Sequence, residues 1–109
     1  MKVLFDQGTP VPLRRHFPEH TVTTAFEEGC SELSNGQLLD AAERAGFELL
    51  ATTDGNLQYQ QNLKERRIAI VVLRSTSWPR IQKSVYAIQL AVGRASNGIY
   101  EEVDIPFVD

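Results

Sequence analysis

Cysteine is almost absent from the sequence, and no stretch of the chain is apolar for long. With Cys30 as the single cysteine, these 109 residues hold no internal disulfide. No apolar leader is evident at Met1, so we expect a reducing, cytoplasmic compartment. No apolar run approaches the ~18 residues that a transmembrane helix needs, so no membrane-spanning segment is expected.

An excess of positive charge is also lacking. The formal net charge is -3 at pH 7, with 11 Lys and Arg against 14 Asp and Glu. The chain as a whole therefore does not attract nucleic acid, and any such binding needs a local basic patch. Hydrophobic residues make up 42% of the sequence, which is enough for one core and predicts a single domain over residues 1–109.

Segments with strand character alternate with segments of helix character. The expected strands cover residues 2–6, 20–25, 47–52, 68–73 and 99–105. The expected helices cover residues 10–15 behind a Thr9 cap, 35–44, 57–63 and a long final helix from Ser77, with Ile81, Val85, Ile88 and Val92 on one face. This alternation predicts an α/β fold, a three-layer α/β/α sandwich with a mostly parallel sheet of four or five strands in the order 2-1-3-4-5.

The clearest local signal is the start of the second expected helix. Ser34 and Gln37 have the spacing of a capping box, and Leu33 with Leu38 has the spacing of a hydrophobic staple around it. Gly46 is suited to end this helix. We therefore predict a helix over residues 35–44.

Two acids follow strand-like runs. Asp6 closes the first run, and Asp54 comes directly after the third. In the predicted order these strands are neighbours, and their carboxyl ends lie at the topological switch point where ligands bind. Asn35, at the start of its helix, is expected at the same edge. Two carboxylates there indicate a hard cation and phosphate chemistry.

The same residues carry a resemblance to a known family. Leu-Phe-Asp-Gln-Gly around Asp6, the Ser34-Asn35 helix start followed by Leu-Leu-Asp-Ala-Ala, and Thr-Thr-Asp-Gly-Asn around Asp54 resemble the short PIN-like proteins of bacteria, relatives of VapC-type toxin nucleases. The resemblance covers residues 1–73. It implies a PIN-like fold, hydrolysis of RNA phosphodiesters with Mg²⁺ or Mn²⁺, and a small antitoxin-like protein as partner.

The chain departs from the family pattern at two positions. Asn35 stands where the family has an acid, and Asn56 stands where it has the second acid of its Asp-x-Asp turn. By resemblance, Asp6 and Asp54 are the catalytic metal ligands, and Asn35 and Asn56 contribute amide oxygens. The loss of two charges predicts weaker Mg²⁺ binding and argues against a second ion.

Two further acids are candidates for a third carboxylate at this edge, although they also have a simpler interpretation. Glu27 and Glu28 follow the second strand, and Glu27 is the preferred third metal ligand; a solvated pair is the alternative.

The residues first named as metal ligands also have alternative roles. Asp54, before a glycine, has the alternative role of capping the next helix, and Asn35 has that of a local cap.

Basic and aromatic residues at the same edge are candidates for substrate binding. Arg74 follows the fourth strand and Arg80 lies in the next helical turn, so both are expected to hold a phosphate; pairing of Arg74 with a nearby acid is the alternative. Tyr59 and Trp78 are expected to stack on a nucleobase, with core packing as the alternative for Trp78.

Two functions remain open at this point. The first is a weak metal-dependent ribonuclease of PIN-like type, the toxin-like component of a toxin–antitoxin pair. The second is a PIN-like module that has lost catalysis and acts by binding RNA or protein. The oligomeric state is also open, and Ile99, Val103 and Phe107 near the last strand could support a symmetric homodimer.

Overall fold

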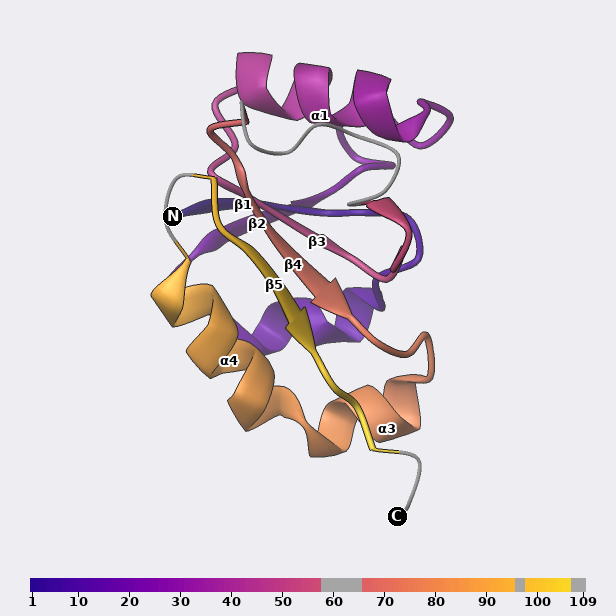
Figure 1. Ribbon diagram of the computed structural model, residues 1–109, viewed down its shortest axis with the longest axis vertical. Helices are drawn as coiled ribbons and strands as arrows, with labels where there is room; N and C mark the ends of the chain where they lie inside the picture. Colours follow the sequence, from indigo (N-terminus) through magenta and orange to yellow (C-terminus); the bar gives the residue numbers. More distant parts are fainter. Residues whose placement is uncertain (58–65, 96–97, 107–109) are drawn as a thin grey trace.

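Five parallel strands form one sheet in the computed structural model, which describes residues 1–57, 66–95 and 98–106 (Figure 1). The strands are β1 (Lys2–Phe5), β2 (Thr21–Thr24), β3 (Leu49–Thr52), β4 (Ala69–Leu73) and β5 (Tyr100–Val103). Their order is β2-β1-β3-β4-β5, and every neighbouring pair is parallel. The predicted class and strand order are therefore confirmed. The helix expected over residues 57–63, apart from Leu57, lies outside the described residues, as do Tyr59 and Phe107.

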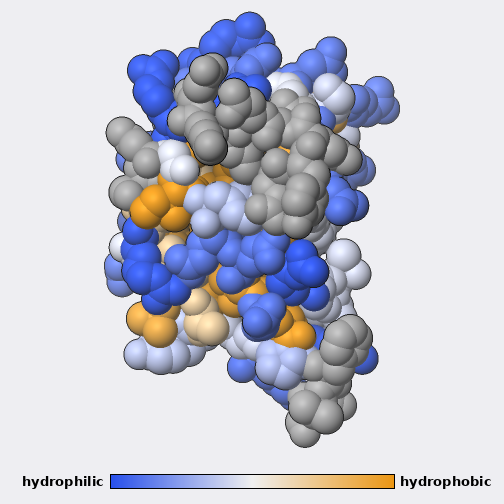
Figure 2. Space-filling view, viewed as in Figure 1, coloured by the Kyte–Doolittle hydropathy of each residue, from blue (hydrophilic) through white to orange (hydrophobic). Residues whose placement is uncertain are grey.

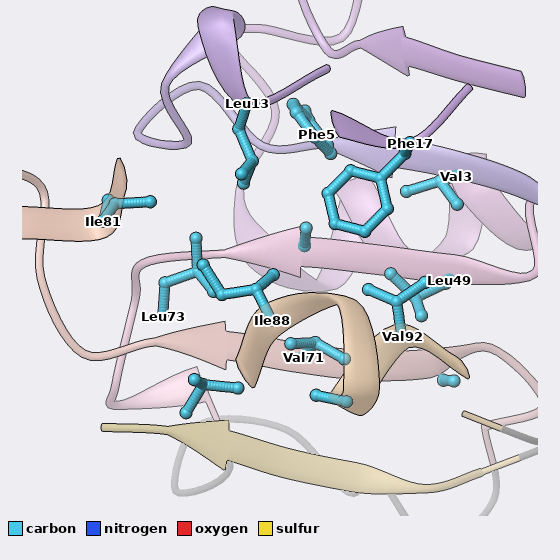
Figure 3. Close-up of a cluster of buried hydrophobic side chains, with 14 of the residues drawn as sticks. Val3, Phe5, Leu13, Phe17, Leu49, Val71, Leu73, Ile81, Ile88 and Val92 are labelled. Atoms are coloured by element: carbon cyan, nitrogen blue, oxygen red, sulfur yellow. The ribbon is translucent and has the colours of Figure 1, made fainter. Parts of the chain in front are cut away.

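Helices cover both faces of this sheet (Figure 1). One face carries α1 (Asn35–Arg44), and the other carries the 3-10 helix η1 (Val11–His16), α3 (Trp78–Lys83) and α4 (Val85–Arg94). Side chains alternate between two cores, because successive residues of a strand point to opposite faces. Leu4 belongs to the core under α1, whereas Val3 and Phe5 belong to the core that η1 and α4 cover (Figure 3).

The helix α1 has the bounds that the sequence predicts. Gln37 donates its backbone N–H to Ser34 Oγ at 3.4 Å, and Ser34 donates its own N–H to Gln37 Oε1 at 3.1 Å. This reciprocal capping box fixes the first turn. Gly46, with φ of +84°, takes the left-handed conformation that follows the helix. Leu38 is buried, while Leu33, its expected staple partner, is exposed.

Two predictions about the other helices were wrong. The long final helix is two helices, because the backbone at Ser84 leaves the helical region with φ of -111° and ψ of 15°. Thr9 does not cap the first helix: Pro10 holds that position, and the buried Thr9 hydroxyl donates to the Ala51 carbonyl at 2.9 Å. The Thr9 hydroxyl thereby ties the loop after β1 to β3.

Most of the surface in one view is hydrophilic, and apolar patches interrupt it around β5 and α4 (Figure 2). Among the described residues, no helix is both long and apolar enough to cross a membrane.

Candidate functional site

Strand alternation brings two polar side chains to the α1 side of the sheet. Phe5 lies opposite Ala51 in the β1–β3 register, and both point into the core under η1 and α4. The next residues, Asp6 and Thr52, must therefore point toward α1. The Asp6 N–H donates to the Ala51 carbonyl at 2.9 Å, so the ladder between the strands continues to the acid.

The buried hydroxyl of Thr52 connects the two predicted acids. Thr52 is 1% exposed. Its Oγ1 donates to Asp6 Oδ2 at 2.7 Å and accepts from the backbone N–H of Asp54 at 3.1 Å. The other carboxylate oxygen of Asp6 accepts from the Gln7 N–H at 2.7 Å. One threonine therefore fixes Asp6 relative to the turn that carries Asp54.

Asp54 joins that turn to the start of α1. Its Oδ2 accepts from Asn35 Nδ2 at 2.7 Å, and its Oδ1 accepts from the Asn56 backbone N–H at 2.9 Å. Asp54 thus bonds a backbone N–H of its own turn and also a residue 19 positions away, whereas the helix that it was expected to cap lies outside the described residues after Leu57. The donor end of the Asn35 amide faces the carboxylate, since two acceptors would repel each other.

Three of the five predicted metal ligands therefore come together: Asp6, Asp54 and Asn35. Asn56 bonds Asp54 through its backbone, and its exposed side chain lines a neighbouring cleft. Within the described part of the chain, no group of three or more His, Cys, Asp and Glu side chains is placed to hold a metal ion. A metal ion bound at this edge would therefore have two carboxylate ligands, and its other ligands would have to be neutral oxygen atoms.

Glu27, the predicted third carboxylate, is engaged elsewhere. Its Oε1 accepts from the Thr24 backbone N–H at 2.9 Å and from Arg14 Nη2 at 2.9 Å. The hydrogen bond from the Thr24 N–H, followed by that from the Arg14 guanidinium, holds the pKa of Glu27 below its usual value, although burial acts in the opposite direction. These bonds tie Glu27 to the end of β2 and to η1.

An open cleft of about 490 Å³ lies beside the turn of Asp54. Its lining residues are Thr53, Gly55, Asn56, Arg74, Ser75, Thr76 and Glu102. Arg74 follows β4 and forms an ion pair with Glu102 of β5, with 3.5 Å between Nη1 and Oε2. The alternative interpretation of Arg74, pairing with an acid, is therefore observed.

Two other residues predicted to bind substrate, Arg80 and Trp78, are absent from the lining of this cleft. Arg80 is in α3 and does not line it. Trp78 packs against the core, and its ring centroid is 6.2 Å from that of His16. Core packing, the alternative stated for Trp78, is what the structure shows.

Two site residues were not anticipated from the sequence, Thr52 and Glu102. Thr52 had a usable signal, because it is the only polar residue of β3, whose four positions are all buried. A buried hydroxyl needs partners, which points to the acids beside it. Glu102 had no such signal.

Comparison with protein-family models, with curated protein sequences and with solved structures finds no significant match. The resemblance to PIN-like proteins therefore depends on the motif residues around Asp6, Asn35 and Asp54.

Proposed function

We propose that this chain is a cytoplasmic, PIN-like ribonuclease that uses a single Mg²⁺ or Mn²⁺ ion and cleaves RNA slowly. The observation that supports this proposal is that the Thr52 hydroxyl bonds both the Asp6 carboxylate and the backbone N–H of Asp54, which holds the two acids at the carboxyl ends of β1 and β3. Hard cations prefer carboxylate and amide oxygens and retain several waters. Two carboxylates with a neighbouring amide suit one such ion and carry too little charge for two.

Each residue has a role that follows from its contacts. Asp6 and Asp54 would hold the ion, which when bound would neutralise phosphate charge and activate a water. Thr52 orients Asp6, and Asn35 orients Asp54, through bonds of 2.7 Å each. Arg74, which lines the adjacent cleft, would bind a phosphate of the RNA strand.

A second function is favoured by a different observation. Both carboxylate oxygens of Asp6 and both of Asp54 already accept a hydrogen bond from the protein. The site is therefore satisfied without a cation, as in a PIN-like module that only binds RNA or a small antitoxin-like protein. Of the residues predicted for a homodimer through β5, Ile99 is exposed and Val103 is buried in the chain's own core, while Phe107 lies outside the described residues.

The test is Mn²⁺ binding by calorimetry, with cleavage of a fluorescent single-stranded RNA measured on the same samples. We expect the wild type to bind at about millimolar Mn²⁺ and Asp6→Ala to lose both binding and cleavage. Asn35→Asp restores a carboxylate and should bind about tenfold more tightly. Asp104→Ala removes an exposed acid that follows β5 and should change neither property.

Two results would decide against the nuclease. Cleavage that persists in Asp6→Ala would exclude this site as its source. If Asn35→Asp binds Mn²⁺ but the wild type does not, the amide of Asn35 prevents metal binding in this chain. The second function, a module that binds RNA or protein without catalysis, would then be the one supported.

A further inference from the structure

The cleft beside Asp54 contains the guanidinium of Arg74, whose ion pair with Glu102 is easily replaced. The Arg74 side chain is 46% exposed, and its closest approach to Glu102 is 3.5 Å. That distance is beyond the usual range of an N–H···O hydrogen bond, so the contact is a loose ion pair in water-accessible surroundings. Exposed ion pairs of this kind contribute little free energy. A ligand that offers Arg74 shorter bonds can displace the carboxylate.

Gly55 leaves room for the Arg74 guanidinium beside the turn that carries Asp54. A Cβ built on Gly55 would lie 2.6 Å from Arg74 Nη1, which is closer than a Cβ carbon approaches another heavy atom that is not bonded to it. The absence of a side chain therefore allows Arg74 to lie over the turn between Asp54 and Asn56. The backbone N–H of Arg74 donates to the Val103 carbonyl at 3.0 Å, which fixes the base of the side chain.

Apart from Arg74 and Glu102, the lining of the cleft is neutral and rich in hydrogen-bonding groups. Thr53, Asn56, Ser75 and Thr76 contribute hydroxyl and amide groups, and Arg74 is the only basic residue of the described lining. Hydroxyls, amides and one guanidinium are the groups that commonly contact phosphate oxygens of a nucleic acid. The volume of about 490 Å³ is within the range of small-ligand sites.

Glu102 is held at the rim by a second contact. Its Oε2, the oxygen that faces Arg74, also accepts from the Tyr100 hydroxyl at 2.9 Å. The carboxylate therefore has a partner of its own when Arg74 turns away. An acid fixed in this way repels an incoming anion and competes with it for the guanidinium.

We propose that this cleft binds one phosphate of a single-stranded RNA through Arg74, and that Glu102 competes with that phosphate for the guanidinium. The inference rests on the proposed function, because it places the strand next to Asp54. On binding, Arg74 exchanges the loose carboxylate contact for short, charge-assisted bonds to phosphate oxygens. Glu102 thereby sets the affinity of the cleft, and only a ligand with a phosphate correctly placed overcomes it.

The chain contains a matched control for both charges. Glu101, the residue beside Glu102, forms an ion pair with Arg94 of α4. Adjacent strand residues face opposite sides of the sheet, so this pair lies away from the cleft. Glu101→Gln changes the net charge by the same amount as Glu102→Gln, and Arg94→Ala by the same amount as Arg74→Ala.

The experiment is fluorescence anisotropy of a labelled uridine hexanucleotide with the full chain, in EDTA and low salt. We expect Arg74→Ala to weaken binding about tenfold, and Glu102→Gln to tighten it about two- to fivefold. Arg94→Ala and Glu101→Gln should change it less than about twofold. The salt dependence of Arg74→Ala should also be shallower, by about one phosphate contact.

Equal effects of Glu102→Gln and Glu101→Gln would overturn the proposal, since net charge alone would then explain them. Equal effects of the two arginine variants, or no binding by the wild type, would overturn it as well. Because no metal is present, this result is separate from the test of the acids. Manganese binding that depends on Asp6 can stand while the cleft fails, and the pattern at Arg74 and Glu102 can hold in a protein that binds no metal.

Discussion

Removal of the Thr52 hydroxyl is the most direct test of how the acids are held. Valine has nearly the shape of threonine but can neither donate to Asp6 Oδ2 nor accept from the Asp54 N–H. Thr52→Val therefore breaks both bonds while the buried end of β3 keeps a β-branched residue of nearly the same size. The substitution separates the linkage of the acids from the acids themselves.

The expected loss of unfolding free energy follows from the two groups that lose a hydrogen-bond partner, the Asp6 carboxylate and the Asp54 N–H. A hydrogen bond to a charged group contributes about 1.5–3 kcal/mol and a neutral one about 0.5–1.5 kcal/mol. Asp6 is only half-buried, so water replaces part of its loss, and the new methyl group regains about 0.8 kcal/mol. We expect the free energy of unfolding to fall by about 1.5–2.5 kcal/mol, which lowers Tm by about 8–15 °C in a domain of this size.

The assay is urea unfolding of the wild type, Thr52→Val and Thr21→Val. Thr21 is exposed on the edge strand β2, so the same change there should alter the unfolding free energy by less than about 0.5 kcal/mol. Calorimetry on the same samples should show weaker Mn²⁺ binding in Thr52→Val alone, because Asp6 loses its orientation. A Thr52→Val protein as stable as Thr21→Val would refute the idea that this hydroxyl links the two acids.

Two further predictions concern Glu43 and Gly55. Burial raises the pKa of Glu43, but hydrogen bonds from the Arg66 side chain and the Arg67 N–H outweigh it and hold the pKa below the usual 4.5. The ionised Glu43 therefore stabilises the folded state fully above about pH 4.5, and this stabilisation is lost as the pH falls through the lower pKa of the folded state. Glu43→Gln should reduce the free energy of unfolding in urea by about 1–2 kcal/mol at about pH 7, and by clearly less at about pH 3.5. Gly55→Ala should displace the flexible Arg74 guanidinium and weaken metal-free RNA binding about threefold, with the unfolding free energy unchanged within about 0.5 kcal/mol. Unchanged RNA affinity in Gly55→Ala would show that the position of Arg74 over the turn does not matter.

The parts of the structure that the sequence predicts depend on local interactions or on few alternatives. The bounds of α1 follow from Ser34 and Gln37, which satisfy each other within three residues. The strand order follows because right-handed crossovers between parallel strands leave few topologies. That order in turn predicts that Asp6 and Asp54 share an edge, and the bonds of Thr52 to both residues agree with it.

The parts that the sequence did not reveal depend on contacts between distant segments. Glu27 pairs with Arg14, 13 residues earlier, and Glu102 with Arg74, 28 residues earlier; nothing in the local pattern of either acid indicates its partner. The break at Ser84 was hidden for another reason. Ile81 and Ile88 are both buried under the sheet, so the apolar period continues across two helices as if they were one.

The Asn35–Asp54 contact relates the two proposed functions to each other. A third acid at position 35 would repel Asp54 in the absence of a cation, whereas the amide donates a hydrogen bond of 2.7 Å. In the proposed metal site, the amide would therefore stabilise the metal-free state and weaken the binding of the cation. Asn35→Asp should accordingly lower the unfolding free energy without metal and raise the affinity for Mn²⁺. If both quantities change in the same direction, Asn35 acts only as the first residue of α1, and the cation affinity of the edge is set elsewhere.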